Sequence, residues 1–138
     1  MGNVHVKWID KFQFIGTDSS KHSVVISSQD EENGVGMKPS ELMLVSLGGC
    51  TAYDVVNILT KKRQKIVGLE IEVSAEQEPD PPWTFTHIHM IYRLRGEDLD
   101  EKAVHDAVKL SKDKYCSVGT TLAKAAKVTY DVVIQEVR

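Results

Sequence analysis

The sequence predicts an α+β fold in one domain covering residues 1–138. Two observations support this class. The first third alternates apolar and polar residues in short segments, and a single long apolar segment then runs over residues 39–63. Because strands follow one another through turns instead of alternating with helices, we expect antiparallel sheets. A chain of 138 residues is long enough to bury one core without crosslinks.

Three strands are predicted in the first third, joined as an antiparallel meander. Their apolar residues are Val4, Val6 and Trp8, then Phe12 and Phe14, then Val24 and Ile26. Turns are expected at residues 10–11 and 16–20. Residues 29–38 contain three acids and two glycines, which predicts a loop.

A long helix is predicted from Pro39 to about Arg63. Proline suits the first helical position because its missing N–H has no helical partner there. The apolar residues of this segment surround most of the helix circumference, which predicts a helix buried on most sides. One sheet does not cover such a helix, so we expect a homodimer.

The rest of the chain predicts a strand over 69–76, a strand over 87–94 that ends at Gly96, a helix from Asp98 to about Lys114, a helix over 117–125 and a strand over 128–137. Asp98 and Glu101 have the spacing of a capping box at the start of the second helix. The predicted order is therefore β-β-β-α-β-β-α-α-β.

Composition narrows the class of function. The net charge is −3, which disfavours nucleic acid or an anionic membrane as the partner. We count no apolar run of about 18 residues, and residues 1–7 lack the apolar stretch of a signal peptide. We therefore expect a cytoplasmic protein. His87 and His89 share a strand face without a third ligand nearby, so we expect exposed histidines and no metal.

The two cysteines, Cys50 and Cys116, carry the most chemical information. Reduced thiols are the rule in the cytoplasm, so a structural disulfide is not expected. Two inert, buried cysteines are one interpretation. Cys50, however, follows Gly48 and Gly49 inside the predicted helix, where each glycine costs about 1 kcal/mol relative to alanine. The glycines indicate either a tight crossing or a space beside Cys50.

Cys116 is predicted to lie where one helix ends and the next begins. A thiol at a helix N-terminus gains from the helix dipole and free N–H groups, which predicts a lowered pKa for Cys116. The cysteines are 66 residues apart, and spacing alone does not establish that their sulfurs meet.

Two motifs resemble those of the OsmC/Ohr family. The first is Pro39-Ser40-Glu41-Leu42 followed by Gly48-Gly49-Cys50-Thr51-Ala52 and Asp54-Val55-Val56, and the second is Tyr115-Cys116-Ser117-Val118 with Thr121-Leu122. The predicted order of elements agrees with the family over essentially the whole chain. The Gly-Gly-Cys sequence is similar to a divergent branch of the family.

The resemblance implies an intertwined homodimer in which antiparallel sheets wrap around long central helices, with sites at the subunit interface. It also implies reduction of organic hydroperoxides by a cysteine-based peroxidase, in defence against oxidative stress. Cys50 would become a sulfenic acid, Cys116 would resolve it as a disulfide, and a cellular dithiol would restore both thiols. Glu41 would help to orient the site. No metal or organic cofactor is implied.

The sequence departs from the peroxidases of the family at two points. They carry glutamate directly after the helix-opening proline, whereas Ser40 follows Pro39 here and Glu41 lies a rotation of about 100° further. Their thiolate is held by an N-terminal arginine, whereas no arginine precedes Arg63 here. Three residues could replace it, from either subunit: Lys7, Lys11 or His22. A non-enzymatic redox sensor or small-molecule binder is therefore the alternative interpretation.

Overall fold

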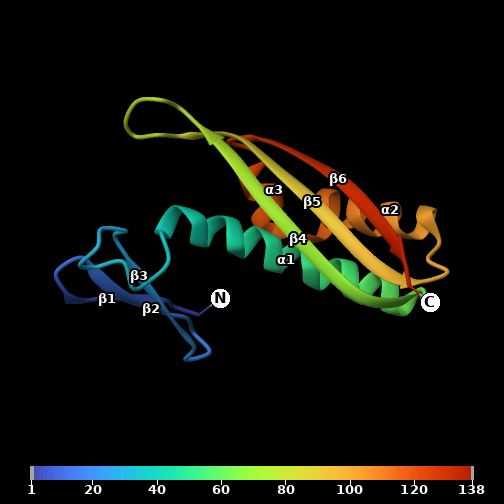
Figure 1. Cartoon of the computed structure of the whole chain (residues 1–138), viewed down its shortest axis with the longest axis horizontal. Helices are drawn as coiled ribbons and strands as arrows, with labels where there is room; N and C mark the ends of the chain where they lie inside the picture. Colours follow the sequence, from blue (N-terminus) through green and yellow to red (C-terminus); the bar gives the residue numbers. More distant parts are fainter. Residues whose placement is uncertain (1, 138) are drawn as a thin grey trace. The chain divides into compact units, whose positions relative to one another are not determined.

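A computed structural model describes residues 2–137 of the chain. The chain forms two compact units, Met1–Met43 and Leu44–Arg138, here called the N-terminal and C-terminal units. The elements are β1 (His5–Asp10), β2 (Gln13–Thr17), β3 (Ser23–Ser27), α1 (Pro39–Lys61), β4 (Lys65–Gln77), β5 (Phe85–Glu97), α2 (Glu101–Leu110), the π-helical segment η1 (Ser111–Tyr115), α3 (Ser117–Leu122) and β6 (Lys127–Glu136) (Figure 1). The predicted order is confirmed, with η1 as an addition.

The N-terminal unit contains the predicted antiparallel meander β1-β2-β3. Phe14 on the middle strand lies opposite Trp8 on one side and Ile26 on the other. Every residue of β1 is exposed in this single chain. The turn between β1 and β2 places Lys11 at a positive φ of 46°, as tight turns often require.

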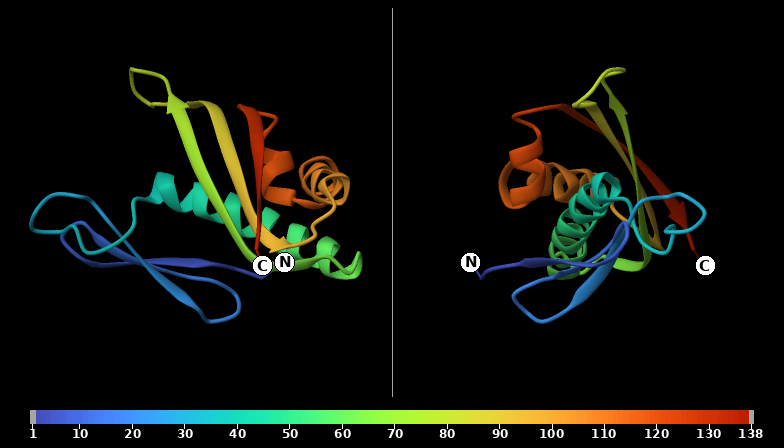
Figure 2. Two further views of the ribbon diagram at one scale, coloured as in Figure 1. Left: turned by 45° about the vertical axis from the view of Figure 1, so that its right-hand side comes forward. Right: turned by 90° about the vertical axis from the view of Figure 1, so that its left-hand side faces the viewer.

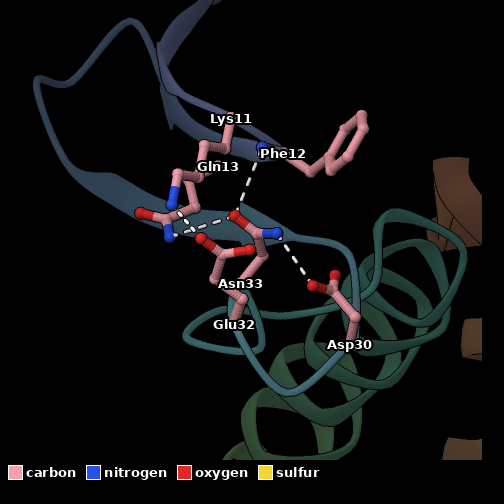
Figure 3. Close-up of polar contacts among 6 residues, drawn as sticks. All are labelled: Lys11, Phe12, Gln13, Asp30, Glu32 and Asn33. Atoms are coloured by element: carbon pink, nitrogen blue, oxygen red, sulfur yellow. Dashed lines mark hydrogen bonds and ion pairs between the residues drawn. The ribbon is translucent and has the colours of Figure 1, made fainter.

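The predicted loop after β3 is confirmed and is held by Asn33, which is only 2% exposed (Figure 3). Its Oδ1 accepts hydrogen bonds from the Phe12 backbone N–H and Gln13 Nε2, each at 3.4 Å. Its Nδ2 donates to Asp30 Oδ2 at 2.8 Å. One buried amide therefore ties the loop to the turn between β1 and β2.

The C-terminal unit contains the sheet β4-β5-β6. β4 and β5 pair in antiparallel, but β5 and β6 are parallel, so the prediction of purely antiparallel sheets was wrong for this pair. The chain leaves β5 and crosses through α2, η1 and α3 before it returns as β6, which restores the original strand direction. Figure 2 shows these crossover helices along one face of the sheet.

The hydrophobic core lies between this sheet and its helices. The predicted inner face of β5 is confirmed, because Ile88, Met90, Tyr92 and Leu94 are each at most 2% exposed. The helices contribute the other large buried residues of the core: Leu47, Val55, Leu59, Val104 and Val108. This core positions the middle of α1 and the start of α3, where the two cysteines lie.

The prediction that α1 is buried on most sides was wrong for the single chain. Its buried residues Leu47, Thr51, Val55 and Leu59 are four apart and form one stripe, while Tyr53 on another face is 71% exposed. One sheet covers only one face of a helix. An 18-residue window within α1 has mean hydropathy 1.5, enough by composition to cross a membrane. Leu47, Val55 and Leu59 of this stripe pack into the hydrophobic core of the C-terminal unit.

The start of the second helix also differs from its prediction. Asp98 has a positive φ of 48°, and Asp100 is the N-cap, whose side chain accepts a hydrogen bond from the Lys102 backbone N–H at 3.1 Å. Glu101 is then the first helical residue, so it cannot complete the predicted capping box. The helical crossover changes to a π-helical turn at Ser111, before the predicted end at Lys114.

Candidate functional site

The fold brings Cys50 and Cys116 together inside the C-terminal unit. Both are free thiols that belong to the same hydrophobic core, and Cys50 is close enough to Cys116 to raise the pKa of the Cys116 thiol. Cys50 lies in the middle of α1 and is half-buried, whereas Cys116 lies between η1 and α3 and is 1% exposed. The two residues are 66 positions apart in the sequence. One thiol is therefore partly open to solvent and the other is enclosed.

Cys116 is held by its place at the N-terminus of α3. It is the N-cap residue, with φ −83° and ψ 100°, and its Sγ accepts a hydrogen bond from the Gly119 backbone N–H at 3.2 Å. Its own N–H donates to the Ser111 carbonyl at 2.8 Å. A Cβ at position 119 would lie 3.2 Å from this Sγ and 3.3 Å from Leu47 Cδ1, so glycine allows the sulfur to approach the helix.

The predicted lowering of the Cys116 pKa was wrong. Burial, followed by the interaction with Cys50, raises the pKa of Cys116 to about 11, and the charge of Asp54 acts in the same direction. The Gly119 N–H opposes this rise but is outweighed. A six-residue helix offers little dipole to offset the loss of water around the sulfur. Cys116 is therefore a neutral thiol near pH 7.

A buried chain of hydroxyl groups lies beside the thiols. Ser111 Oγ donates to Asp54 Oδ2 at 2.8 Å, and Thr51 Oγ1 lies 2.7 Å from both Ser111 Oγ and the Tyr92 hydroxyl. Because Ser111 has one hydroxyl proton and gives it to Asp54, Thr51 donates to Ser111 and Tyr92 donates to Thr51. The chain thus runs from Tyr92 to the Asp54 carboxylate. Burial, the largest cause, raises the pKa of Tyr92 to about 12.

The sequence interpretation missed this chain, although two of its residues adjoin Cys50. Thr51 follows Cys50 directly and stands in the buried stripe of α1, and Asp54 lies one turn further along the helix. A threonine within an otherwise apolar helical stripe was an available signal, since buried hydroxyl groups need partners. Nothing in the local sequence pointed to Ser111 or Tyr92 as those partners.

A cavity of about 140 Å³ borders Cys116. Leu47, Met90 and Val128 line it with apolar groups, and Thr51 and Tyr92 contribute their hydroxyl-bearing side chains. Lys112 and Asp113 of η1 also line it. Within residues 2–137 we find no group of three or more histidine, cysteine or acidic side chains that could hold a metal ion.

The two glycines before Cys50 have different surroundings. A Cβ at Gly48 would lie 3.5 Å from Val73 Cγ2, so this glycine faces a helix–sheet crossing with β4. A Cβ at Gly49 would meet no heavy atom within 4 Å, and Gly49 is exposed. Since 3.5 Å is an ordinary van der Waals contact, the crossing with β4 does not by itself require glycine at position 48, and within this chain Gly49 borders open space.

The other predicted site residues belong to the N-terminal unit. Glu41 is exposed about two and a half turns before Cys50 on α1, and its Oε2 lies 3.6 Å from Lys38 Nζ. Among the cations considered as substitutes for arginine, Lys11 pairs with Glu32 and the His22 ring nitrogen Nδ1 lies 2.8 Å from Ser20 Oγ. The participation of Glu41 or of these cations in the site stays a prediction.

The prediction that the strand histidines are exposed was wrong, because both are half-buried and contact β6. His87 Nε2 and His89 Nδ1 lie 2.7 Å and 2.6 Å from Thr129 Oγ1, and His89 Nε2 lies 3.1 Å from Asp131 Oδ2. These contacts support the parallel pairing of β5 and β6. They do not reach the cysteines, which lie on the helical side of the unit.

This fold, with a thiol on its long helix and a second thiol at the start of a short one, is that of an OsmC-like protein. Residues 29–131 match the family described as OsmC-like protein, and the chain belongs to that family. The resemblance inferred from the two cysteine motifs is therefore confirmed at the level of the family.

Known relatives cover nearly all of the chain. It is 39% identical over 130 residues to Protein YhfA of Escherichia coli strain K12, covering 93% of this chain and 96% of YhfA. A hypothetical protein from Aquifex aeolicus VF5 has a crystal structure with TM-score 0.83 and 28% identity, covering 98% of each chain. The organic hydroperoxide resistance protein OhrB of Bacillus subtilis shares the fold, with TM-score 0.62 and 15% identity over 94% of this chain and 96% of OhrB.

Proposed function

We propose that this chain is a thiol-dependent reductase of organic hydroperoxides that acts in defence against oxidative stress. The observation that carries the proposal is the proximity of a half-buried Cys50 and an enclosed Cys116. In this proposal the half-buried thiol reacts with the substrate, and the enclosed thiol reacts with the sulfenic acid that forms. Membership of the OsmC-like family and the fold shared with the hydroperoxide resistance protein OhrB support this function.

The proposed reaction has two steps on the protein. The Cys50 thiolate attacks one peroxide oxygen, the O–O bond breaks, and the alcohol leaves with a proton. Cys50 is then a sulfenic acid. Cys116 condenses with it, so that an S–S bond forms and water leaves. A cellular dithiol reduces the disulfide and restores both thiols.

The substrate class follows from the surroundings of the thiols. Leu47 and Met90 present apolar surface in the cavity that borders Cys116, which favours an organic hydroperoxide over hydrogen peroxide. We include in the proposal a cytoplasmic homodimer, in which Glu41 helps to orient the site. The exposed apolar residues of α1, such as Val45 at 54% and Tyr53 at 71%, support an interface there.

Single-turnover oxidation tests the proposal. One equivalent of cumene hydroperoxide should consume both free thiols of the reduced protein and lower its mass by two hydrogens. The variant C116S should stop at a sulfenic acid that dimedone traps on Cys50, and C50S should form no sulfenic acid at Cys50 and no disulfide within the chain. A wild-type protein that keeps both thiols free under mild excess peroxide would contradict the proposal.

The second candidate is a non-enzymatic redox sensor or small-molecule binder. The absence of arginine before Arg63 favours it, because the family's peroxidases use such a residue to hold their thiolate. Steady-state turnover separates the two functions. A reductase should consume many equivalents of hydroperoxide when a dithiol is present, whereas a sensor should oxidise once and return slowly.

A further inference from the structure

The segment that carries Cys116 has a rare winding. The π-helical turn η1 continues α2 directly, and the Cys116 N–H donates to the Ser111 carbonyl at 2.8 Å. This bond spans five residues instead of the four of an α-helix, a winding that is found mostly at functional sites. Cys116 therefore stands where residue 115 would stand in an α-helix, a difference of about 100° around the helix axis. The place of the Cys116 thiol depends on what holds η1.

Ser111 fastens this turn to α1. The residue is fully buried, with 0% exposed. Its Oγ donates to Asp54 Oδ2 at 2.8 Å and lies 2.7 Å from Thr51 Oγ1, and both partners belong to α1. The bond to the Asp54 carboxylate is charge-assisted and so stronger than a bond between neutral groups. Ser111 thus holds Cys116 through its carbonyl and α1 through its hydroxyl.

The other polar contacts of η1 are local. Asp113 Oδ2 accepts a hydrogen bond from Lys109 Nζ at 2.7 Å, within the same helical crossover, and Lys114 Nζ lies 5.3 Å from the centre of the Tyr115 ring. Such contacts support the turn itself but do not fasten it to α1. Loss of the Ser111 hydroxyl should therefore release η1, and the Cys116 thiol with it, while the rest of the fold remains.

We propose that Ser111, held by Asp54 and Thr51, is the positioning residue that keeps Cys116 in place to resolve the oxidised Cys50. This inference rests on the proposed function and deepens it, because it names the residue on which the resolving step depends. Thr51 directly follows Cys50, and Asp54 lies one turn further along α1. The hydroxyl groups thus join the segment of one cysteine to the helix of the other.

The chemistry of the resolving step stays with the two cysteines. The Cys116 thiol attacks the Cys50 sulfenic acid, the S–O bond breaks as the S–S bond forms, and the thiol proton leaves with the hydroxide as water. Ser111 takes up no proton or electron in this step. Its contribution is to the position of the attacking sulfur.

The reactivity of Cys116 alone tests the positioning without any peroxide. In the C50S protein Cys116 is the only cysteine, and DTNB measures how often its thiol becomes exposed. We expect C50S/S111A to react about tenfold faster than C50S, because a buried hydrogen bond to a charged group is lost. C50S/D54N should react less than about threefold faster, since the asparagine carbonyl still accepts from Ser111.

A matched control separates local release from a general loss of stability. Val104 is fully buried in the same core but lies outside η1 and the hydroxyl chain, so C50S/V104A is compared at low urea concentrations. A local opening exposes little surface, so the DTNB rate of C50S/S111A should hardly depend on urea, whereas global opening of C50S/V104A should accelerate steeply. A DTNB rate of C50S/S111A that equals that of C50S, or that rises as steeply with urea as the control, would overturn the inference.

The resolving step supplies the second measurement. After one equivalent of cumene hydroperoxide, S111A should form the disulfide about tenfold more slowly than the wild type, so that dimedone traps more sulfenic acid on Cys50. D54N should form the disulfide at a rate closer to the wild type. An S111A protein that resolves as fast as the wild type would contradict the proposal. A wild-type protein that keeps both thiols free would instead overturn the proposed function, and the DTNB rates distinguish this case because they need no peroxide.

Discussion

The two sheets of this molecule have similar sequence patterns but opposite surroundings. In the C-terminal unit, β5 alternates between exposed or half-buried residues and a fully buried inner face. In the N-terminal unit, β1 alternates just as regularly and is exposed throughout. All thirteen buried apolar side chains among residues 2–137 lie between Leu47 and Ala126. Alternation thus predicts strands, but it does not tell whether the same chain covers them.

The difference follows from what comes next in the chain. The strand β5 is followed by α2, η1 and α3, which cover the inner face of its own sheet. The meander is followed by a loop and the start of α1, and its Trp8 and Phe12 are 66% and 63% exposed. Apolar strand residues without cover are typical of binding surfaces, which supports the proposed homodimer.

The largest expected loss of stability comes from a substitution in the core of the C-terminal unit. Leu47 is fully buried, so L47A should lower the free energy of unfolding by about 2–5 kcal/mol. The matched change F12A in the exposed sheet should cost within about 0.5 kcal/mol if that face is open to solvent. Urea unfolding at several protein concentrations makes the comparison. A large cost for F12A that grows with concentration would mean that a second copy covers the meander.

The next effect is a loss of stability at alkaline pH. The pKa of Tyr92 rises on folding from 10.0 to about 12, so its contribution is present below about pH 10 and is lost as pH rises through about 12. The rise bounds this loss at about 3 kcal/mol. The pKa of Cys116 rises on folding from 9.0 to about 11, so its contribution to stability is lost at alkaline pH in the same way. Urea unfolding of reduced Y92F against pH should show a flatter decline, and an unchanged decline would contradict the assignment.

A somewhat smaller loss of stability is expected when the buried chain of hydroxyl groups is interrupted. T51V removes the hydroxyl that joins Tyr92 to Ser111, so two buried groups lose a partner and unfolding should become easier by about 1–3 kcal/mol. T60V on the exposed side of the same helix is the control and should change stability by at most about 0.5 kcal/mol. Equal effects of the two variants would show that the buried chain adds nothing to stability.

The smallest loss of stability is expected from a substitution in an exposed ion pair of the N-terminal unit. Lys11 and Glu32 form an ion pair in which both side chains are more than half exposed. Such pairs contribute about 0–1 kcal/mol, so K11A should barely change the unfolding midpoint at moderate salt. N33A should cost more, because it removes the buried amide that holds the same loop (Figure 3). A K11A variant as unstable as N33A would be the unexpected result.

Local patterns predicted much of the fold because they depend on neighbours in the sequence. The alternation around Trp8 and Tyr92 identified strands, and Pro39 marked the start of α1 correctly. The cap of α2 was placed two residues too early, at Asp98 instead of Asp100. Both aspartates fit a cap by composition, and the positive φ of Asp98, which excludes it, depends on how the chain leaves β5.

By itself, the sequence determined that this protein has an OsmC-like fold and two cysteines in characteristic settings, Cys50 within a long helix and Cys116 before a short one. The tertiary structure alone decided that the two thiols lie close together, that β6 runs parallel to β5 and that Thr51, Ser111 and Asp54 form one chain. It also reversed the expected direction of the Cys116 pKa. The helix terminus acts through neighbours in the sequence, whereas desolvation and the proximity of Cys50 exist only when distant segments pack together.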